Sequence, residues 1–146
     1  SFQDYASQCD LQYDLIICNP PFFSGSKKTE SKSKNLDRHD DSLSLGYLFK
    51  SSVSLMKETA ILSLILPVDK EAQAMNLIKK HQLHCRRITR AKPTPQKPAK
   101  RVLLELSFLP GKCHEDELII ELGKRHEYSD AFKSLTDKFY LGEGDW

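Results

Sequence analysis

The chain has 146 residues, of which 39% are hydrophobic and 29% charged, a composition ordinary for one globular domain with a core of its own. No apolar run approaches the length of a membrane-spanning helix. The four cysteines are widely separated and form no Cys-x-x-Cys pair, which argues against a disulfide framework and favours a reducing cytoplasm. Cys113 and His114 are adjacent but lack a second pair of ligands, so no metal site is predicted.

The formal net charge is only +2, but it is unevenly distributed. Residues 79–101 contain nine Lys or Arg and no acidic residue, whereas the rest of the chain carries 13 basic and 20 acidic side chains. A concentrated basic segment on an otherwise acidic protein suggests contact with a polyanion. The alternative is a solvated helix end followed by an exposed loop.

The first strong element is the apolar run at residues 13–18, after a segment at 2–6 that reads as a loop entering a short helix. An apolar run without polar alternation predicts a strand buried on both faces, as in a parallel sheet flanked by helices. Pro20 and Pro21 cannot donate ladder hydrogen bonds, so the strand must end before them. Residues 19–22 then lie beyond its carboxyl end, where ligands bind in open α/β sheets.

The tetrapeptide Asn19-Pro20-Pro21-Phe22 fits a specific chemistry. The amino group of a nucleobase is a poor nucleophile until both of its hydrogens are held by acceptors. The side-chain oxygen of Asn19 and the backbone oxygen of Pro20 are the candidate acceptors, pre-organised by the fixed φ of the prolines. Phe22 would stack on a flipped-out base. The alternative is a strand followed by a Pro-Pro turn with a core phenylalanine.

Residues 24–41 form a polar, lysine-rich stretch without apolar periodicity, which predicts a long functional loop directly after this motif. We expect it to close over the target nucleotide. Its candidate substrate contacts, with the aromatic residue that precedes it, are Phe23, Lys27, Lys28, Arg38 and His39.

The remaining elements alternate between strand and helix. The expected order is a helix at 42–57, a strand at 59–68, a helix at 70–81, a strand at 83–89, an exposed basic loop with three prolines at 91–100, a strand at 101–109, a short edge strand at 117–122 and an amphipathic helix at 129–140.

Asn-Pro-Pro-aromatic after an apolar strand resembles motif IV of the class I, S-adenosylmethionine-dependent methyltransferases that modify amino nitrogens. The motif alone does not choose between adenine-N6, guanine-N2 and glutamine-N5 enzymes. The element order resembles the C-terminal half of their α/β fold. That resemblance implies a three-layer sandwich with a mostly parallel sheet and an antiparallel final hairpin.

The C-terminal half of the chain narrows the resemblance. Residues 38–40 (Arg-His-Asp), 101–104 (Arg-Val-Leu-Leu), and 128–132 (Tyr-Ser-Asp-Ala-Phe) with Phe139-Tyr140-Leu141 resemble the bacterial tRNA1(Val) adenine-37 N6-methyltransferases. The resemblance implies S-adenosylmethionine as the methyl donor and tRNA as the substrate.

Carried over from that family, Asn19, Pro20, Pro21 and Phe22 are the expected catalytic residues. The expected cofactor contacts are Asn19, Ser1 and Phe2. Ser1 occupies the position at which relatives often have Asp near the cofactor adenine. The basic segment supplies the expected RNA contacts, which are Arg86, Arg87, Arg90, Lys92, Lys97, Lys100 and Arg101.

No glycine-rich cofactor loop or ribose-binding acidic residue precedes the motif. We therefore expect this chain to be the C-terminal part of a longer protein and to be inactive alone. Residues 15–18 would then form an exposed apolar strand edge that pairs with another chain. Two alternatives remain, namely a protein-glutamine N5-methyltransferase and a non-catalytic RNA-binding module with a degenerate methyltransferase fold.

Overall fold

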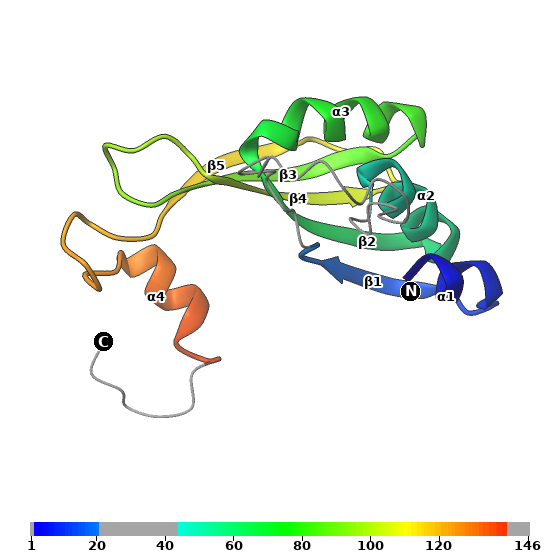
Figure 1. The fold of residues 1–146 in the computed structure, drawn as a ribbon, viewed down its shortest axis with the longest axis horizontal. Coiled ribbons are helices and arrows are strands. Elements are labelled where there is room, and N and C mark those ends of the chain that lie inside the picture. The colour runs from blue at the N-terminus through cyan, green and yellow to red at the C-terminus, as the bar shows by residue number, and fades with distance from the viewer. Residues whose placement is uncertain (1, 21–43, 140–146) are drawn as a thin grey trace, which may run out of the picture.

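The computed structural model describes residues 2–20 and 44–139, which form one five-stranded sheet with helices (Figure 1). The strands are β1 (Tyr13–Cys18), β2 (Met56–Pro67), β3 (His84–Lys92), β4 (Arg101–Ser107) and β5 (His114–Ile119). The helices are α1 (Phe2–Gln8), α2 (Leu45–Leu55), α3 (Glu71–Lys80) and α4 (Asp130–Thr136), with a 3-10 turn at Val68–Lys70 before α3.

The strand order across the sheet is β1-β2-β4-β3-β5. β1 is parallel to β2, β3 is parallel to β5, and β4 is antiparallel to both of its neighbours, β2 and β3. Four strands therefore share one direction and β4 alone is reversed. This arrangement confirms the predicted mostly parallel sheet with an antiparallel hairpin, and it brings the carboxyl ends of β1, β2, β3 and β5 to one edge.

The core lies between the sheet and α2 and α3. Side chains alternate along β2 and β4, so every second residue faces these helices. The buried set on this face is Leu62, Leu64, Leu66, Val102, Leu104 and Leu106, each at most 1% exposed. Phe49 from α2 and Ala74 from α3 are both fully buried against them. Burial of this apolar surface, at about 25 cal/mol per Å², is the main source of stability.

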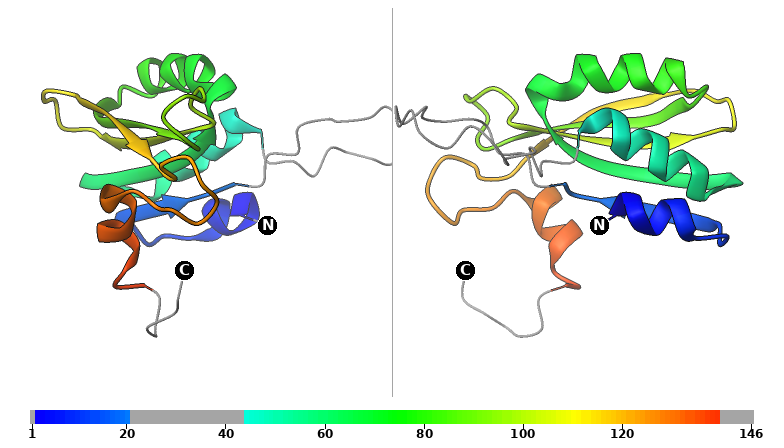
Figure 2. Two further views of the ribbon diagram at one scale, coloured as in Figure 1. Left: turned by 90° about the vertical axis from the view of Figure 1, so that its left-hand side faces the viewer. Right: turned by 45° about the vertical axis from the view of Figure 1, so that its right-hand side comes forward.

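The opposite face of the sheet is covered less completely. The views in Figure 2 show α1, α2 and α3 on one side of the sheet and α4 on the other. β1 lies at the end of the strand order, and Leu15 and Ile17 are 54% and 71% exposed. The prediction that this strand is buried on both faces is therefore wrong for this chain, because helices cover only one face of β1. The prediction of an exposed apolar strand edge is confirmed.

Two strands, β3 and β5, begin or end at other residues than the sequence pattern predicts, because their bounds are set by pairing with neighbouring strands. β3 continues past residue 89 to Lys92, because Ala91 pairs with Arg101 on one side and Leu118 on the other. The exposed loop therefore shortens to residues 93–100. β5 begins and ends three residues earlier than predicted, since the charged residues at 114–117 pair with β3. It lies at the sheet edge, as predicted.

Side-chain caps define where α2 and α4 begin. Ser44 Oγ accepts a hydrogen bond from the Tyr47 amide at 3.3 Å, so α2 begins after Ser44 and not at residue 42. Ser129 Oγ accepts from the Phe132 amide at 3.1 Å and caps α4, which ends at Thr136, earlier than predicted. Within 2–20 and 44–139, none of the helices has the length and apolar character needed to cross a membrane.

Candidate active site

The carboxyl end of β1 presents a polar side chain followed by a buried proline. The β1–β2 ladder runs to the pair Cys18–Leu64, and the chain leaves the sheet at the next two residues. Asn19 is exposed and Pro20 is buried. The amide of Asn19 is thus not committed to the core, and Pro20 fixes the backbone beside it. This geometry keeps a hydrogen-bond acceptor available to a ligand at the sheet edge.

The neighbouring strands bring the β3–β4 loop to the same edge. The Val68 amide, directly after β2, donates to the Lys100 carbonyl at 3.3 Å, and the Lys100 amide donates to the Ala91 carbonyl at 2.9 Å. Arg101 pairs with Pro67 at the end of β2. Asn19 and Lys100 therefore lie two strands apart at this end of the sheet, with Lys100 about three residues further along the strand direction. Figure 1 shows the hairpin loop extending beyond the sheet end to which β1 points.

The cations of this hairpin loop face solvent. Lys97, Lys100 and Arg101 are all exposed, and none of them forms an ion pair within the described part of the chain. Lys97 lies in a turn closed by a hydrogen bond from its own amide to the Thr94 carbonyl at 3.1 Å. Among the predicted RNA contacts that the structure describes, these three cations remain available to a phosphate.

The other predicted RNA contacts on β3 are engaged within the protein. Arg90 binds Glu71 of α3 through Nη2 at 2.5 Å and Nε at 3.2 Å, and it binds Glu115 at 3.0 Å. These hydrogen bonds, with that of Glu71 first, raise the pKa of Arg90. Lys92 lies 3.4 Å from Glu117. The acidic residues of β5 and α3 therefore neutralise much of the basic charge that the sequence gathers here.

Arg87 and Arg86 are also bound to the protein. Arg87 pairs with Asp116 at 2.5 Å; the hydrogen bond from Thr89 and then the Arg87 guanidinium lower the pKa of Asp116. Arg86 Nη1 donates to the Pro110 carbonyl at 2.8 Å. A Cβ at Gly111 would lie 1.8 Å from that Nη1, so the absence of a side chain there lets the guanidinium cross the chain. Arg86 thus fastens the connection between β4 and β5.

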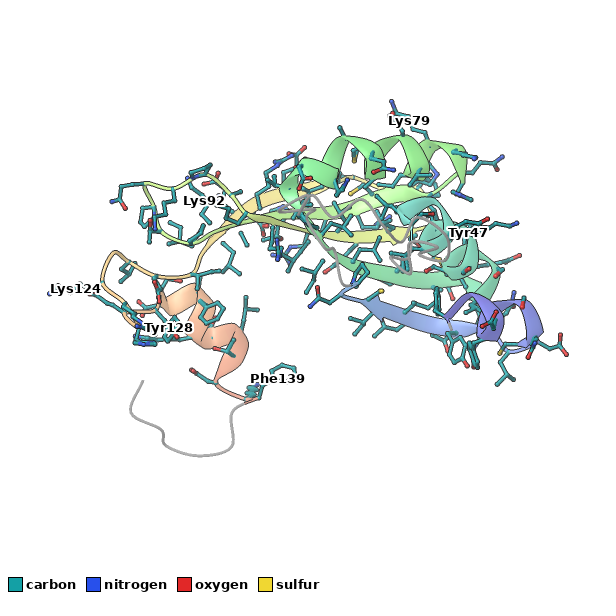
Figure 3. All side chains as sticks on the ribbon, in the orientation of Figure 1. Tyr47, Lys79, Lys92, Lys124, Tyr128 and Phe139 are labelled. Atoms are coloured by element: carbon teal, nitrogen blue, oxygen red, sulfur yellow. The ribbon has the colours of Figure 1, made fainter. Side chains whose placement is uncertain are left out.

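The structure adds two exposed cations that the sequence analysis missed. Lys124 and Arg125 lie in a tight turn after β5, closed by hydrogen bonds from the Leu122 amide to the Glu127 carbonyl and from the Glu127 amide to the Lys124 carbonyl, at 2.8 and 3.2 Å. Figure 3 shows Lys124 and Lys92 toward the same end of the molecule, with Lys79 of α3 far from both. A Lys-Arg pair directly after a predicted strand was the available signal.

The remaining predicted site residues are placed as follows. Phe2, in α1, is half-buried and packs against the core cluster. Eight others lie outside the described residues, namely Ser1, Pro21, Phe22, Phe23, Lys27, Lys28, Arg38 and His39.

No family model matches the chain. It is 36% identical over 138 residues to a tRNA1(Val) (adenine(37)-N6)-methyltransferase of Flavobacterium psychrophilum. It is 38% identical to proteins of the same name from Christiangramia forsetii and Trichodesmium erythraeum. This chain is homologous to these methyltransferases. The three alignments cover 92–97% of this chain and 55–59% of the relatives.

Solved structures show the same fold at low sequence identity. A protein of Agrobacterium tumefaciens described as a predicted O-methyltransferase has a TM-score of 0.62 at 17% identity, over 86% of this chain and 51% of that protein. The M1.HpyAVI–SAM complex has a TM-score of 0.52 at 12% identity, over 95% of this chain and 69% of that protein. The chain therefore has an α/β methyltransferase fold.

Substitution of Arg90, which forms ion pairs, and of Lys97, which forms none among the described residues, tests whether the paired cations stabilise the fold. Arg90→Gln should lower the free energy of unfolding by about 1–2 kcal/mol, because it removes the charged hydrogen bonds that Arg90 donates to Glu71 in a partly exposed site. Lys97→Gln should change it by less than about 0.5 kcal/mol, as expected for an exposed side chain without an ion pair. Urea unfolding of the two variants measures the difference. Equal effects would mean that the Arg90 pairs add no stability.

Proposed function

We propose that the full-length protein transfers a methyl group from S-adenosylmethionine to N6 of adenine 37 in tRNA1(Val), in the cytoplasm. The observation that carries this proposal is the exposed Asn19 and buried Pro20 at the carboxyl end of β1. Support for the substrate comes from the relatives' names, at 36–38% identity. Because the chain spans 55–59% of those relatives, the activity is proposed for the whole protein.

In this proposal the residues after β1 bind and activate the target amine. The Asn19 side-chain oxygen and the Pro20 carbonyl each accept one N6 hydrogen, which favours a pyramidal nitrogen with its lone pair free to react. Both acceptors are fixed before the reaction by the end of the ladder and the prolines. Pro21 and Phe22 complete the motif, with Phe22 stacking on the base. S-adenosylmethionine, when bound, supplies the electrophilic methyl group.

The described residues fit the amine-binding half of such a site better than the cofactor-binding half. Their three glycines, Gly46, Gly111 and Gly123, are widely separated in the chain and form no Gly-x-Gly turn. A phosphate- or ribose-binding turn of that kind is typical of nucleotide cofactors in α/β sheets. We infer that the isolated chain lacks methyltransferase activity and that Ser1, Phe2 and Asn19 supply at most part of the cofactor site.

The substrate surface in this proposal runs along the end of the sheet at which the carboxyl ends of β1, β2, β3 and β5 lie. Lys97, Lys100 and Arg101 of the hairpin contact tRNA phosphates, and Lys124 and Arg125 extend the same edge beyond β5. The candidate contacts that lie outside the described residues, Phe23, Lys27, Lys28, Arg38 and His39, would add to this surface. Contacts of this type fix the orientation of a nucleic acid, while Asn19 and Phe22 select the base.

Asn19→Ala in the full-length protein tests the catalytic proposal. Loss of one amine acceptor should lower kcat for tRNA methylation by about 100- to 1000-fold and leave the Kd for tRNA nearly unchanged. Asn76→Ala, an exposed asparagine of α3, is the matched control and should retain full activity. Methylated adenosine is quantified by mass spectrometry of digested tRNA. An unmethylated tRNA with the wild-type protein would refute the enzymatic proposal and leave a binding module.

Charge reversal tests the proposed RNA surface. Lys97→Glu, Lys100→Glu and Arg101→Glu should each weaken tRNA binding and lower the slope of log Kd against log salt by about 1 per lost phosphate contact. Lys79→Glu and Lys80→Glu at the distant end of α3 are the controls. Filter binding at several salt concentrations gives both quantities. Equal weakening by the control variants would show a nonspecific charge effect and not a binding surface.

Cofactor binding by the isolated 146-residue chain tests the proposed division of the protein. Titration calorimetry with S-adenosylmethionine should give no heat of binding for this chain and a measurable one for the full-length protein. Micromolar binding by the isolated chain would contradict the proposal, because these 146 residues would then bind the cofactor without the rest of the full-length protein.

We propose further that the isolated chain self-associates through β1. The free edge of β1 and its exposed Leu15 and Ile17 offer backbone pairing and apolar contact together. Ile17→Lys should shift the chain to a monomer in sedimentation velocity. Leu135→Lys, at a 59% exposed leucine of α4, is the control and should leave association unchanged. A monodisperse wild-type monomer would overturn this proposal.

A further inference from the structure

A bulge in β3 brings two distant cysteines into register. Cys85 pairs with Leu106 of β4, and Arg87 pairs with Glu105, the neighbour of Leu106. The step from Cys85 to Arg87 is two residues on β3 but only one residue on β4. Arg86 is the extra residue. Cys85 and Arg87 therefore occupy consecutive positions of the ladder.

The strand on the other side of β3 completes the arrangement. Arg87 is the parallel partner of His114, the first residue of β5. The residue before His114 is Cys113, so the position next to Cys85 belongs to Cys113. Neighbouring strands lie about 4.8 Å apart, and disulfides join Cα atoms about 4.4–6.8 Å apart. One strand spacing, continued from the Arg87–His114 pair to Cys85 and Cys113, falls within the range that a disulfide spans.

The side chains agree with this placement. Cys85 and Cys113 are both half-buried and pack against the same core cluster. The Cys85 thiol donates to the Arg87 carbonyl at 3.4 Å, and Cys113 lies close enough to affect the pKa of Cys85. Burial first, and then the contact with Cys113, raise the pKa of Cys85 to about 12. Cys85 therefore keeps its proton, and its sulfur reacts only after that proton is lost.

The hydrogen bond from Arg86 to Pro110 holds the segment that carries Cys113. The guanidinium leaves the bulge, crosses Gly111 and donates to Pro110, three residues before Cys113. The bulge thus has two effects. It sets the register of Cys85, and its extra residue, Arg86, binds the segment that leads to Cys113.

We propose that Cys85 and Cys113 form a reversible disulfide, in exchange with oxidised glutathione, that fastens β3 to β5. The Cys113 sulfur attacks one sulfur of oxidised glutathione, breaks its S–S bond and releases one reduced glutathione. The Cys85 sulfur then loses its proton and attacks Cys113 in the mixed disulfide, and a second reduced glutathione leaves with that proton. Two protein thiols are oxidised and one glutathione disulfide is reduced.

The disulfide lies away from the candidate active site. Cys85 is near the amino end of β3, and Cys113 directly precedes the amino end of β5, whereas Asn19 lies at the carboxyl edge. The bond therefore acts on the stability of the β3–β5 edge and is independent of the proposed methyl transfer.

Peptide mapping of the intact protein tests the proposal without any variant. The reduced protein is equilibrated with glutathione buffers of increasing oxidised fraction, quenched in acid, alkylated and digested with trypsin. The expected product joins peptides 81–86 and 113–124 with the loss of two hydrogens. The oxidised form should unfold at a higher urea concentration than the reduced form. Separate glutathione adducts on the two cysteines, cross-links to Cys9 or Cys18, or full alkylation in every buffer would each overturn the proposal.

Variants check the contribution of each residue. Cys85→Ser or Cys113→Ser should abolish the cross-link, and Cys9→Ser and Cys18→Ser, the matched controls, should leave it unchanged. Arg86→Gln should lower the equilibrium constant for disulfide formation roughly fivefold, the effect of one lost hydrogen bond at the Cys113 segment. An unchanged constant in Arg86→Gln would remove Arg86 from the mechanism, and a cross-link surviving in Cys85→Ser would refute the pair.

Discussion

The pairing of β2 with β1 on one side and β4 on the other is the constraint on which the rest of the structure depends. β2 contributes Leu62, Leu64 and Leu66 to the core, and its ladders set the register of both neighbours. The parallel pairing with β1 carries Asn19 to the same edge at which β2 ends. A slip of one residue would turn the buried leucines outward and move Asn19 away from this edge, so the hydrophobic pattern of β2 also fixes the position of the site.

Electrostatic pairing divides the basic segment into two groups with different roles. Arg87, Arg90 and Lys92 lie on β3, where β5 and α3 present carboxylates opposite them. Lys97 and Lys100 lie in the loop beyond the paired region, and Arg101 pairs with Pro67 and Ala91, neither of which carries a carboxylate. The sheet therefore uses part of the basic charge to hold its own edge strand. The charge left to attract a polyanion is smaller than the sequence suggests and is concentrated at the carboxyl edge.

Most elements of the fold were predictable, and the errors have physical causes. The strand–helix alternation follows from apolar runs and proline positions that are local in the chain, whereas the reversed β4 was implied by the family resemblance. The bounds of β3 and β5 were missed because charged residues 114–117 look unlike a strand until their partners on β3 are known. Burial of β1 on both faces was wrong, since an apolar run does not specify how many faces other elements cover.

The sequence by itself determined the Asn19-Pro20 motif, the alternation of strands and helices and the exposed proline-rich loop, because each depends on residues close together in the chain. Only the tertiary structure decided which cations remain unpaired and which cysteines meet. Arg90 is neutralised by residues 19 and 25 positions away, and Cys113 reaches Cys85 through a bulge and a parallel ladder. Such pairs are set by strand register, which is a property of the assembled sheet.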